Sequence, residues 1–231
     1  MYAVNKKVAR PKAKPRPRLS RERVLRAAME HADKGGIETL TMRRLAEALG
    51  VAPMALYRHV SNKDDLIDAM VDLVFSEVGL PPAGADWKTA MRERALSLRD
   101  VLSRHRWAIG LMESRRSPGP ANLRHHDAVI GSLRQGGFSV AMTAHAYSVL
   151  DAYIYGFALT KMNLPFESSE EIADVAQSML EPFPINEYPS LVEFLHEHVM
   201  KPGYDYGDEF EYGLDLVLEG LETVRDISRR A

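Results

Sequence analysis

The chain has 231 residues, of which 45% are apolar and 27% are charged, and it contains no cysteine. This composition is ordinary for a folded globular protein and excludes disulfide-stabilised, collagen-like and largely disordered classes. No stretch approaches the roughly 18 consecutive apolar residues of a membrane span, and the N-terminus has no apolar segment like that of a signal peptide, so we expect a cytoplasmic protein that does not contact membranes.

Charge is distributed unevenly along the chain. Residues 1–63 carry 15 Lys and Arg against 5 Asp and Glu, whereas residues 64–231 carry 15 against 27. This asymmetry indicates a cationic module that meets a polyanion, joined to an acidic body that does not. A basic tail is also a common solubility feature, so the tail alone does not decide between polyanion binding and a role in solubility.

The first 18 residues, MYAVNKKVARPKAKPRPR, contain seven cations, three prolines and no acid. They have almost nothing to bury and cannot repay the entropy of ordering. We therefore predict a disordered basic arm over residues 1–18.

Four helices are predicted next. Ser20 is expected to cap the first, which ends at Gly35-Gly36, and Thr41 to cap the second, residues 42–49. Pro53 suits the first turn of the third helix, and Ser61 with Asp64 has the spacing of a capping box that opens the fourth.

Helical spacing of apolar residues continues to the end of the chain, and no alternation typical of a strand is found. We predict an all-α protein with a small N-terminal domain, residues 19–65, and a larger helical domain, residues 66–231. The later helices are expected at residues 87–105, 107–113, 121–135, 140–162, 170–180, 191–200 and 208–228.

Residues 41–59 have the pattern of a helix-turn-helix. Small Ala46 lets two helices approach closely, and Gly50 can take a positive φ at the end of the first of them. Leu45, Leu49 and Leu56 are expected to face the core. The second helix is then free to lie in the major groove of DNA.

The exposed face of this motif is predicted to be cationic. Arg43, Arg44, Arg58 and Lys63 lie on it together with a histidine, and only Glu47 opposes them. A merely solvated face of a structural bundle, which is the alternative, normally mixes both signs. Lys63 also adds a cation where a helix N-terminus already favours a phosphate. The face therefore indicates DNA binding.

The stretch LSRERVLRAAMEHADKGGIETLTMRRLAEALGVAPMALYRHVSNKDDLIDAM closely resembles the DNA-binding domain of TetR-family (tetracycline-repressor-like) transcriptional regulators. The shared features are a Gly before an apolar pair and "LT", an Arg-x-Leu-Ala helix, "LGV", and "LY" followed by His-Val and "NK". A weaker resemblance continues through WKTAMRERALSLRDVLSRHR and the "GGF" at residues 136–138.

The resemblance implies roles for individual residues. Thr41, Tyr57 and Lys63 are expected to contact phosphate, Arg43 to reach a base edge such as guanine, and His59 to lie against the DNA backbone. The positions that read bases in the family hold apolar residues here, which offer thymine-methyl contacts but few hydrogen bonds. The arm is expected to add minor-groove contacts. The predicted DNA-binding residues are Thr41, Arg43, Arg44, Pro53, Met54, Ala55, Tyr57, Arg58, His59 and Lys63.

The resemblance also implies a C-terminal domain that dimerises and holds a small-molecule pocket. The apolar faces of residues 140–162 and 208–228 agree with this, although burial within one subunit would explain them too. Two-fold pairing supplies the spacing of about 34 Å between recognition helices.

Tetracycline is not the expected effector. Tetracycline repressors hold the drug and its magnesium ion with polar side chains, and the corresponding places here are Gly79, Arg94 and Met112. A thioether does not ligate magnesium, so we expect metal-independent binding of another molecule. The predicted pocket residues, which would otherwise pack the core, are Trp107, Met112, Tyr147, Asp151 and Tyr155. Buried Asp151 would need a partner.

No metal site, cofactor or catalytic function is expected. Glu193 and His196 have helical spacing suited to a metal, but one such pair on a polar surface is typically solvated. The sequence has no Gly-x-Ser-x-Gly motif and no phosphate loop.

The sequence therefore predicts a homodimeric repressor, released from a palindromic DNA operator by a small molecule other than tetracycline–magnesium. The alternative is a DNA-coating protein that uses the arm and helix-turn-helix without sequence preference.

Overall fold

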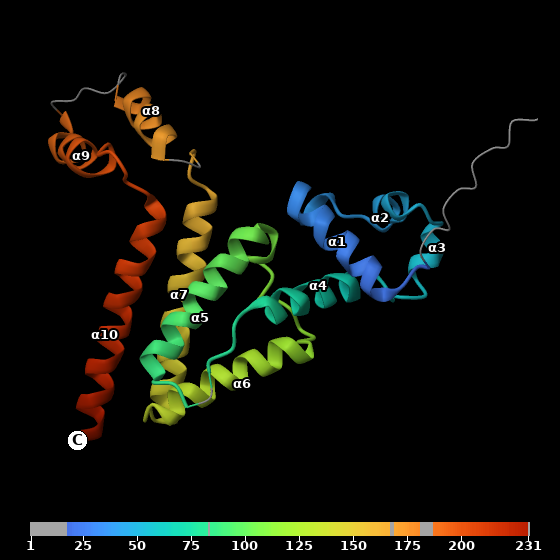
Figure 1. The fold of residues 1–231 in the computed structure, drawn as a ribbon, viewed down its shortest axis with the longest axis horizontal. Helices are drawn as coiled ribbons and strands as arrows, with labels where there is room; N and C mark the ends of the chain where they lie inside the picture. The colour runs from blue at the N-terminus through green and yellow to red at the C-terminus, as the bar shows by residue number, and fades with distance from the viewer. Residues whose placement is uncertain (1–17, 83, 167–168, 181–186, 231) are drawn as a thin grey trace, which may run out of the picture.

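The computed structural model describes residues 18–82, 84–166, 169–180 and 187–230, and every regular element in these ranges is a helix (Figure 1). The predicted all-α class is confirmed. The predicted arm, residues 1–18, lies outside the described ranges except for Arg18. The helices are α1 (Arg21–Gly35), α2 (Met42–Leu49), α3 (Pro53–Leu56), α4 (Lys63–Glu77), α5 (Trp87–Arg104), α6 (Pro120–Gln135), α7 (Val140–Met162), α8 (Ser169–Leu180), α9 (Pro189–Phe194) and α10 (Glu209–Arg230).

Short turns connect several of these helices. The 3₁₀ turns are η1 (Ile37–Thr39), η2 (Arg106–Ala108) and η5 (Tyr206–Asp208), and a π-helical turn, η4 (Leu195–Val199), follows α9. The helix expected at residues 107–113 is therefore wrong in extent, because only η2 and irregular turns occupy that stretch.

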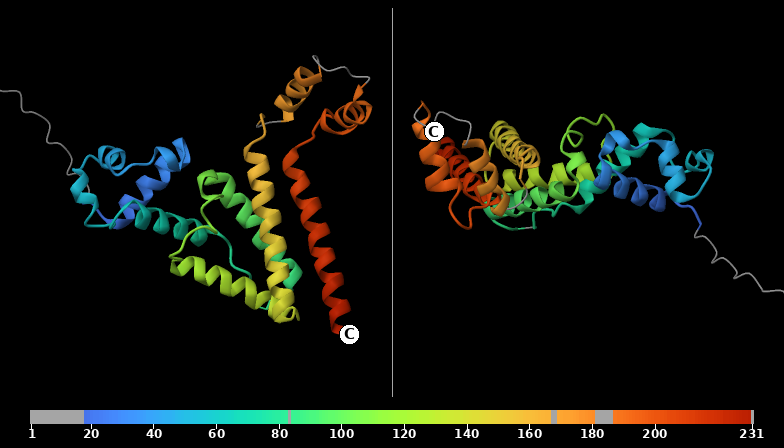
Figure 2. Two further views of the ribbon diagram at one scale, coloured as in Figure 1. Left: turned by 180° about the vertical axis from the view of Figure 1, so that it is seen from behind. Right: turned by 90° about the horizontal axis from the view of Figure 1, so that it is seen from above.

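The helices are arranged along one long axis (Figures 1 and 2). The segment from α1 to α3 lies at one end, α5 to α7 form the middle, and α10 runs antiparallel beside α7 at the other end. None of the helices in the described ranges is long and apolar enough to cross a membrane.

Helix α4 belongs to both halves of the molecule. It packs against α1 on one side and α6 on the other. Its apolar face, which includes Leu66, Met70 and Phe75, is buried, and the ring of Phe75 lies 5.4 Å from that of His125 on α6. Helix α4 therefore connects the N-terminal helices to the middle helices.

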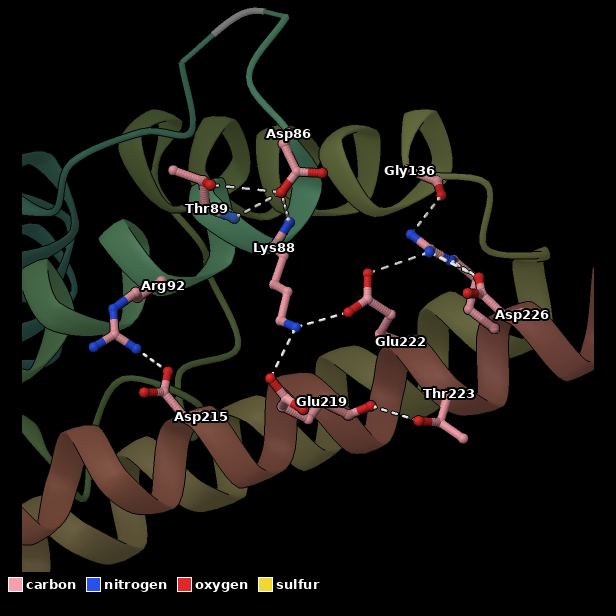
Figure 3. A network of polar contacts seen from close by, with 11 residues as sticks. Asp86, Lys88, Thr89, Arg92, Gly136, Asp215, Glu219, Glu222, Thr223 and Asp226 are labelled. Carbon is pink, nitrogen blue, oxygen red and sulfur yellow. Dashed lines mark hydrogen bonds and ion pairs between the residues drawn. The ribbon is translucent and has the colours of Figure 1, made fainter.

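Helix α10 has two apolar faces. Phe210, Leu214 and Leu218 are buried against the rest of the chain, whereas Tyr212 and Leu216 are exposed by 69% and 60%. The buried face is flanked by ion pairs to α5. Figure 3 shows Lys88 directed towards Glu219 and Glu222 of α10, and Arg92 beside Asp215. The Nζ of Lys88 lies 2.7 Å from Glu222 and 3.3 Å from Glu219. Among the residues that the structure describes, nothing covers the second apolar face.

Candidate functional site

Helix α2 is defined at both ends by its own sequence. The Oγ1 of Thr41 accepts a hydrogen bond from the Arg44 amide at 3.2 Å, as an N-cap does. Gly50 ends the helix in the left-handed region, at φ 67° and ψ 36°, and the Val51 amide donates to the Ala46 carbonyl at 3.0 Å. These contacts confirm the predicted cap and turn, and they fix the direction in which the chain leaves α2.

Helix α3 is only one turn long. It begins at Pro53, and beyond Leu56 the chain continues as turns in which the His59 amide donates to the Leu56 carbonyl at 2.8 Å. Leu56 is fully buried, whereas Met54 is 74% and Tyr57 45% exposed. One buried leucine therefore anchors a short element whose other side chains face solvent.

All the predicted DNA-binding residues lie at the surface or near it. Seven are exposed, and Ala55, His59 and Lys63 are half-buried. They come from α2, α3 with the turns after it, and the first turn of α4. The exposed ones are Thr41, Arg43, Arg44, Pro53, Met54, Tyr57 and Arg58.

Two of the arginines on this surface are held by neighbours. Arg43 Nε lies 3.0 Å from Glu47 Oε1, one helical turn away, and Arg44 Nη1 donates to the Thr39 carbonyl at 3.1 Å. The Arg43 side chain is still 84% exposed, so its ion pair with Glu47 is a weak surface contact. A phosphate or base can compete for it.

The start of α4 differs from the expectation by one residue. Asn62, rather than Ser61, is the N-cap, and its Oδ1 accepts from the Asp65 amide at 2.8 Å. Asp65, rather than Asp64, completes the motif by accepting from the Ser61 amide at 2.7 Å. Lys63 is thus the first residue of α4, where unpaired amides and the helix dipole favour an anion.

A buried ion pair lies between α5 and α7. Arg94 Nη2 donates to Asp151 Oδ1 at 2.6 Å, and the two side chains are only 1% and 10% exposed. Arg94 Nε also donates to Nε2 of His125 at 3.2 Å. The partner that a buried Asp151 requires is therefore Arg94. The family resemblance places Arg94 at a drug-holding position, but it is not among the predicted pocket residues.

Two of the predicted pocket tyrosines border this ion pair. The hydroxyl of Tyr147 is hydrogen-bonded to Nδ1 of His126, and its ring lies 5.5 Å from the Arg94 guanidinium. The Tyr155 hydroxyl donates to exposed Glu113 at 3.0 Å. Burial, and then the negative charge of Asp151, raises the pKa of both tyrosines, so both remain protonated at neutral pH.

The five predicted pocket residues do not form one group. Tyr147, Asp151 and Tyr155 gather around Arg94, and Met112 is buried after η2. Trp107 faces elsewhere, because its Nε1 donates to Asp33 of α1 at 2.7 Å. It lies where the N-terminal helices meet the rest of the chain.

His105 completes this junction and was not predicted. Its Nδ1 lies 2.7 Å from Asp33 of α1, and its Nε2 lies 3.2 Å from Glu77 at the end of α4. Burial raises the pKa of Glu77, but hydrogen bonds from Arg104 and His105 outweigh that effect and lower it. The carboxylates of two N-terminal helices are therefore tied to one segment that follows α5.

Helix α4 is also tied to the middle of the molecule at two further points. Asp68 pairs with Arg115, and Asp72 Oδ1 accepts from the amides of Ala121 and Asn122, both at 2.9 Å. The second contact places a carboxylate at the N-terminus of α6, where the helix dipole favours it.

Comparison with known proteins identifies this arrangement. Residues 24–70 match the model of bacterial regulatory proteins of the tetR family, and residues 80–225 match the model of the tetracyclin repressor-like C-terminal domain. The chain belongs to the TetR family. It is therefore a helix-turn-helix transcription regulator with an N-terminal DNA-binding domain and a C-terminal ligand-binding domain.

Characterised TetR-family relatives align over most of the chain. The transcriptional repressor DrrR1 of Streptomyces coeruleorubidus is 30% identical over 93% of this chain and 82% of its own length. The class C tetracycline repressor of Escherichia coli is 30% identical over 90% of this chain and 93% of its own length. ActR of Streptomyces coelicolor, crystallised in complex with actinorhodin, superposes with a TM-score of 0.72 at 28% identity, over 90% of this chain and 99% of that one.

The magnesium ion that accompanies tetracycline in this family does not fit the residues present. Met112 offers a thioether, Arg94 brings a guanidinium cation, and the carboxylate of Asp151 is already paired with it. Within the described ranges, no group of three or more His, Asp or Glu side chains is arranged to hold a metal ion.

Proposed function

We propose that this TetR-family regulator is a dimeric cytoplasmic repressor that leaves a palindromic operator when it binds a small molecule other than tetracycline–magnesium. In this proposal residues 19–65 read DNA, and residues 66–231 dimerise and bind the effector. DrrR1 and the class C tetracycline repressor are both named as repressors, which supports repression rather than activation.

The observation that carries the DNA-binding role is the exposed surface built on α2 and α3. A capped helix, a left-handed turn at Gly50 and a buried Leu56 present Tyr57 and Met54 to solvent beside Arg43. In a helix-turn-helix this is the side that enters the major groove. The proposed contacts are to phosphate for Thr41, Tyr57, His59 and Lys63, and to a base edge for Arg43, with Arg44, Pro53, Met54, Ala55 and Arg58 alongside.

Dimerisation is supported by apolar side chains on α7 and α10 that the described part of the chain leaves exposed. Val149 and Leu159 on α7 are each 47% exposed, and Leu216 and Ile227 on α10 are 60% and 62% exposed. A second copy that packs on these two helices buries them. It also places two reading surfaces on one DNA duplex, about 34 Å apart or a multiple of that.

The effector is proposed to bind beside Tyr147, Asp151, Tyr155 and Met112. Tyr147 is hydrogen-bonded to His126 on α6, and the N-terminus of α6 holds Asp72 of α4. A ligand that shifts α6 moves α4 and, through Asp33, His105 and Trp107, also α1. To lower operator occupancy a hundredfold, the ligand must favour the non-binding arrangement by about 2.7 kcal/mol.

Selection of bound fragments from a genomic library tests the proposal, followed by mobility shifts on the recovered DNA. Tyr57→Ala is expected to abolish the shift and leave the helical content unchanged. Tyr188→Ala is the matched control, because Tyr188 is equally exposed at 46% but lies at the start of α9. Retention of the shift by Tyr57→Ala would contradict the proposed interface.

Competition with random DNA separates this function from sequence-independent coating of DNA. An operator reader keeps its complex in excess random DNA, whereas a coating protein loses it. When the logarithm of the DNA-binding constant is plotted against the logarithm of the salt concentration, each phosphate contact is also expected to steepen the negative slope by ~0.9. Equal affinity for all sequences would favour the coating function.

A further inference from the structure

Two polar atoms inside the buried cluster have no protein partner. Arg94 Nη1 and His125 Nδ1 form no hydrogen bond with any described residue, although the two residues are only 2% and 0% exposed. Their other nitrogens are used, since Arg94 Nε and Nη2 bond to His125 Nε2 and Asp151. Buried polar groups are nearly always paired, so these two atoms point to a missing group.

The chemistry of the missing group follows from the existing bonds. The guanidinium of Arg94 can only donate, so His125 Nε2 must accept its hydrogen bond. Burial, together with the positive charge of Arg94 and the neighbouring His126, lowers the pKa of His125 to about 3, and its ring is neutral. A neutral ring that accepts at Nε2 carries its proton on Nδ1. Both unpaired atoms are therefore donors, and the missing group is an acceptor.

The charge of the missing group follows from the ion pair. Arg94 and Asp151 are both nearly inaccessible to water and already balance each other. An anion beside them would add a buried charge with no counter-charge, which costs several kcal/mol. A neutral acceptor avoids this cost. A carbonyl oxygen is such an acceptor, whereas an ammonium group would repel the donors.

Aromatic rings surround the donors. The ring of His125 lies 5.4 Å from that of Phe75, the His126 ring lies 5.5 Å from Tyr147, and Tyr147 also lies against Arg94. At the edge of the cluster the Tyr155 hydroxyl donates to exposed Glu113. Glu113 lies in the irregular stretch after η2.

We propose that the effector is a neutral aromatic ketone or quinone whose carbonyl oxygen accepts hydrogen bonds from Arg94 Nη1 and His125 Nδ1. This inference rests on the proposed function only for the claim that the bound molecule is the effector. Arg94 and His125 then select the ligand by its polar group, and the rings hold its planar body.

A matched set of naphthalene probes tests the selectivity. The set is 2-acetylnaphthalene, 2-ethylnaphthalene, 2-naphthoate and 2-naphthylmethylammonium, which share one skeleton and differ only in the polar group. By calorimetry we expect the ketone to bind at least about tenfold more tightly than the ethyl compound, as one hydrogen bond provides. The naphthoate should bind more weakly than the ketone, and the ammonium compound should not bind.

The full-length double variant Arg94→Met/Asp151→Leu removes one of the two donors, Arg94 Nη1, without leaving a buried charge. It is expected to lower the preference for the ketone over the ethyl compound to about threefold, because His125 Nδ1 still donates to the carbonyl oxygen. Arg92→Met is the control, because Arg92 lies on the same helix but pairs with Glu211 and Asp215 on α10. It should keep the full preference.

Three results would overturn the inference. Equal affinity of the ketone and the ethyl compound would mean that water serves the donors, tighter binding of the naphthoate would refute the charge argument, and binding of the ammonium compound would refute the donor count. A tautomer measurement supplies a test that needs no variant. Long-range ¹H–¹⁵N correlation on histidine-labelled wild-type protein should place the His125 proton on Nδ1, and a proton on Nε2 would contradict the argument.

Operator binding by the wild-type protein keeps the two claims distinguishable. If the ketone binds as expected but does not release operator, the site is supported and its role as effector site fails. If the protein releases operator only with 2-naphthylmethylammonium, whose polar group donates hydrogen bonds, the proposed function stands and this inference fails.

Discussion

Removal of Asp151 alone should destabilise the protein far more than removal of the whole ion pair. Arg94 keeps its charge when Asp151 is replaced, and its side chain is 1% exposed, so Asp151→Leu leaves an uncompensated buried cation. Such a loss typically costs about 3–5 kcal/mol. Arg94→Met/Asp151→Leu replaces both charges with apolar groups and is expected to cost less than about 1 kcal/mol, because the desolvation penalty disappears with the pair.

Urea unfolding followed by circular dichroism measures this difference, at one fixed protein concentration because a dimer's stability depends on it. The double-mutant cycle should give a coupling energy of at least about 2 kcal/mol between the two side chains. Arg92→Met, which removes a partly exposed pair, should cost about 1 kcal/mol or less. A loss below about 1 kcal/mol for Asp151→Leu, or a double variant as unstable as the sum of the single ones, would refute the reasoning.

Four further predictions concern other parts of the chain. Gly50→Ala should lower the free energy of unfolding by about 1–2 kcal/mol, since alanine is strained at φ 67°, and Gly50→Asn should cost less; equal stability of all three proteins in urea would contradict this. Glu47→Ala should release Arg43 from its ion pair and strengthen operator binding in a mobility shift, while the free energy of unfolding changes by less than about 0.5 kcal/mol. Weaker operator binding would argue against a base contact by Arg43. Because the pKa of His125 is lowered to about 3, the unfolded chain binds a proton there that the folded chain does not. The stability contributed by this group is complete above the unfolded pKa near 6.5 and falls as the pH drops towards 3, by about 2 kcal/mol at pH 5. In urea unfolding between pH 7 and 5, His125→Gln should lose this part of the dependence of the free energy of unfolding on pH. An unchanged pH dependence would exclude a neutral buried His125. Leu216→Glu should dissociate the dimer in sedimentation equilibrium, while Leu123→Glu on α6, at a similar 56% exposure, should not; a dimeric Leu216→Glu protein would place the interface elsewhere.

Local signals made the helix-turn-helix predictable. Thr41 and Gly50 act on amides and dihedrals within a few residues, so the sequence alone places both ends of α2. The same kind of signal was ambiguous at α4, where Ser61-x-x-Asp64 and Asn62-x-x-Asp65 both have capping spacing. The structure uses Asn62 as the cap, together with Asp65. Asp65 also lies 3.8 Å from Arg21 of α1, a contact that no local pattern predicts.

The buried cluster was only half predictable. Asp151 on an apolar helix required a partner, but the sequence does not say which of many cations supplies it, because Arg94 is 57 residues away. A signal was nevertheless present. Arg94 falls on the same helical stripe as Met91, Ala95 and Leu98, all buried, and a cation on such a stripe has to be paired.

The junction could not be predicted from spacing at all. Trp107 and His105 follow α5, yet their partner Asp33 lies on α1, more than 70 residues earlier. Spacing along the chain therefore does not distinguish Trp107 from a pocket residue. The geometry instead makes Trp107 and His105 links between the two halves of the molecule.

The central claim is that two copies of the α2–α3 surface read one operator at a spacing set by their dimer. Hydroxyl-radical footprinting on a selected genomic fragment, with the mass of the complex measured in parallel, tests it most directly. The account predicts two chains per fragment and two symmetric protected half-sites, with centres about one helical turn, or a multiple of it, apart. A single protected half-site occupied by one chain, or uniform protection along the fragment, would contradict it.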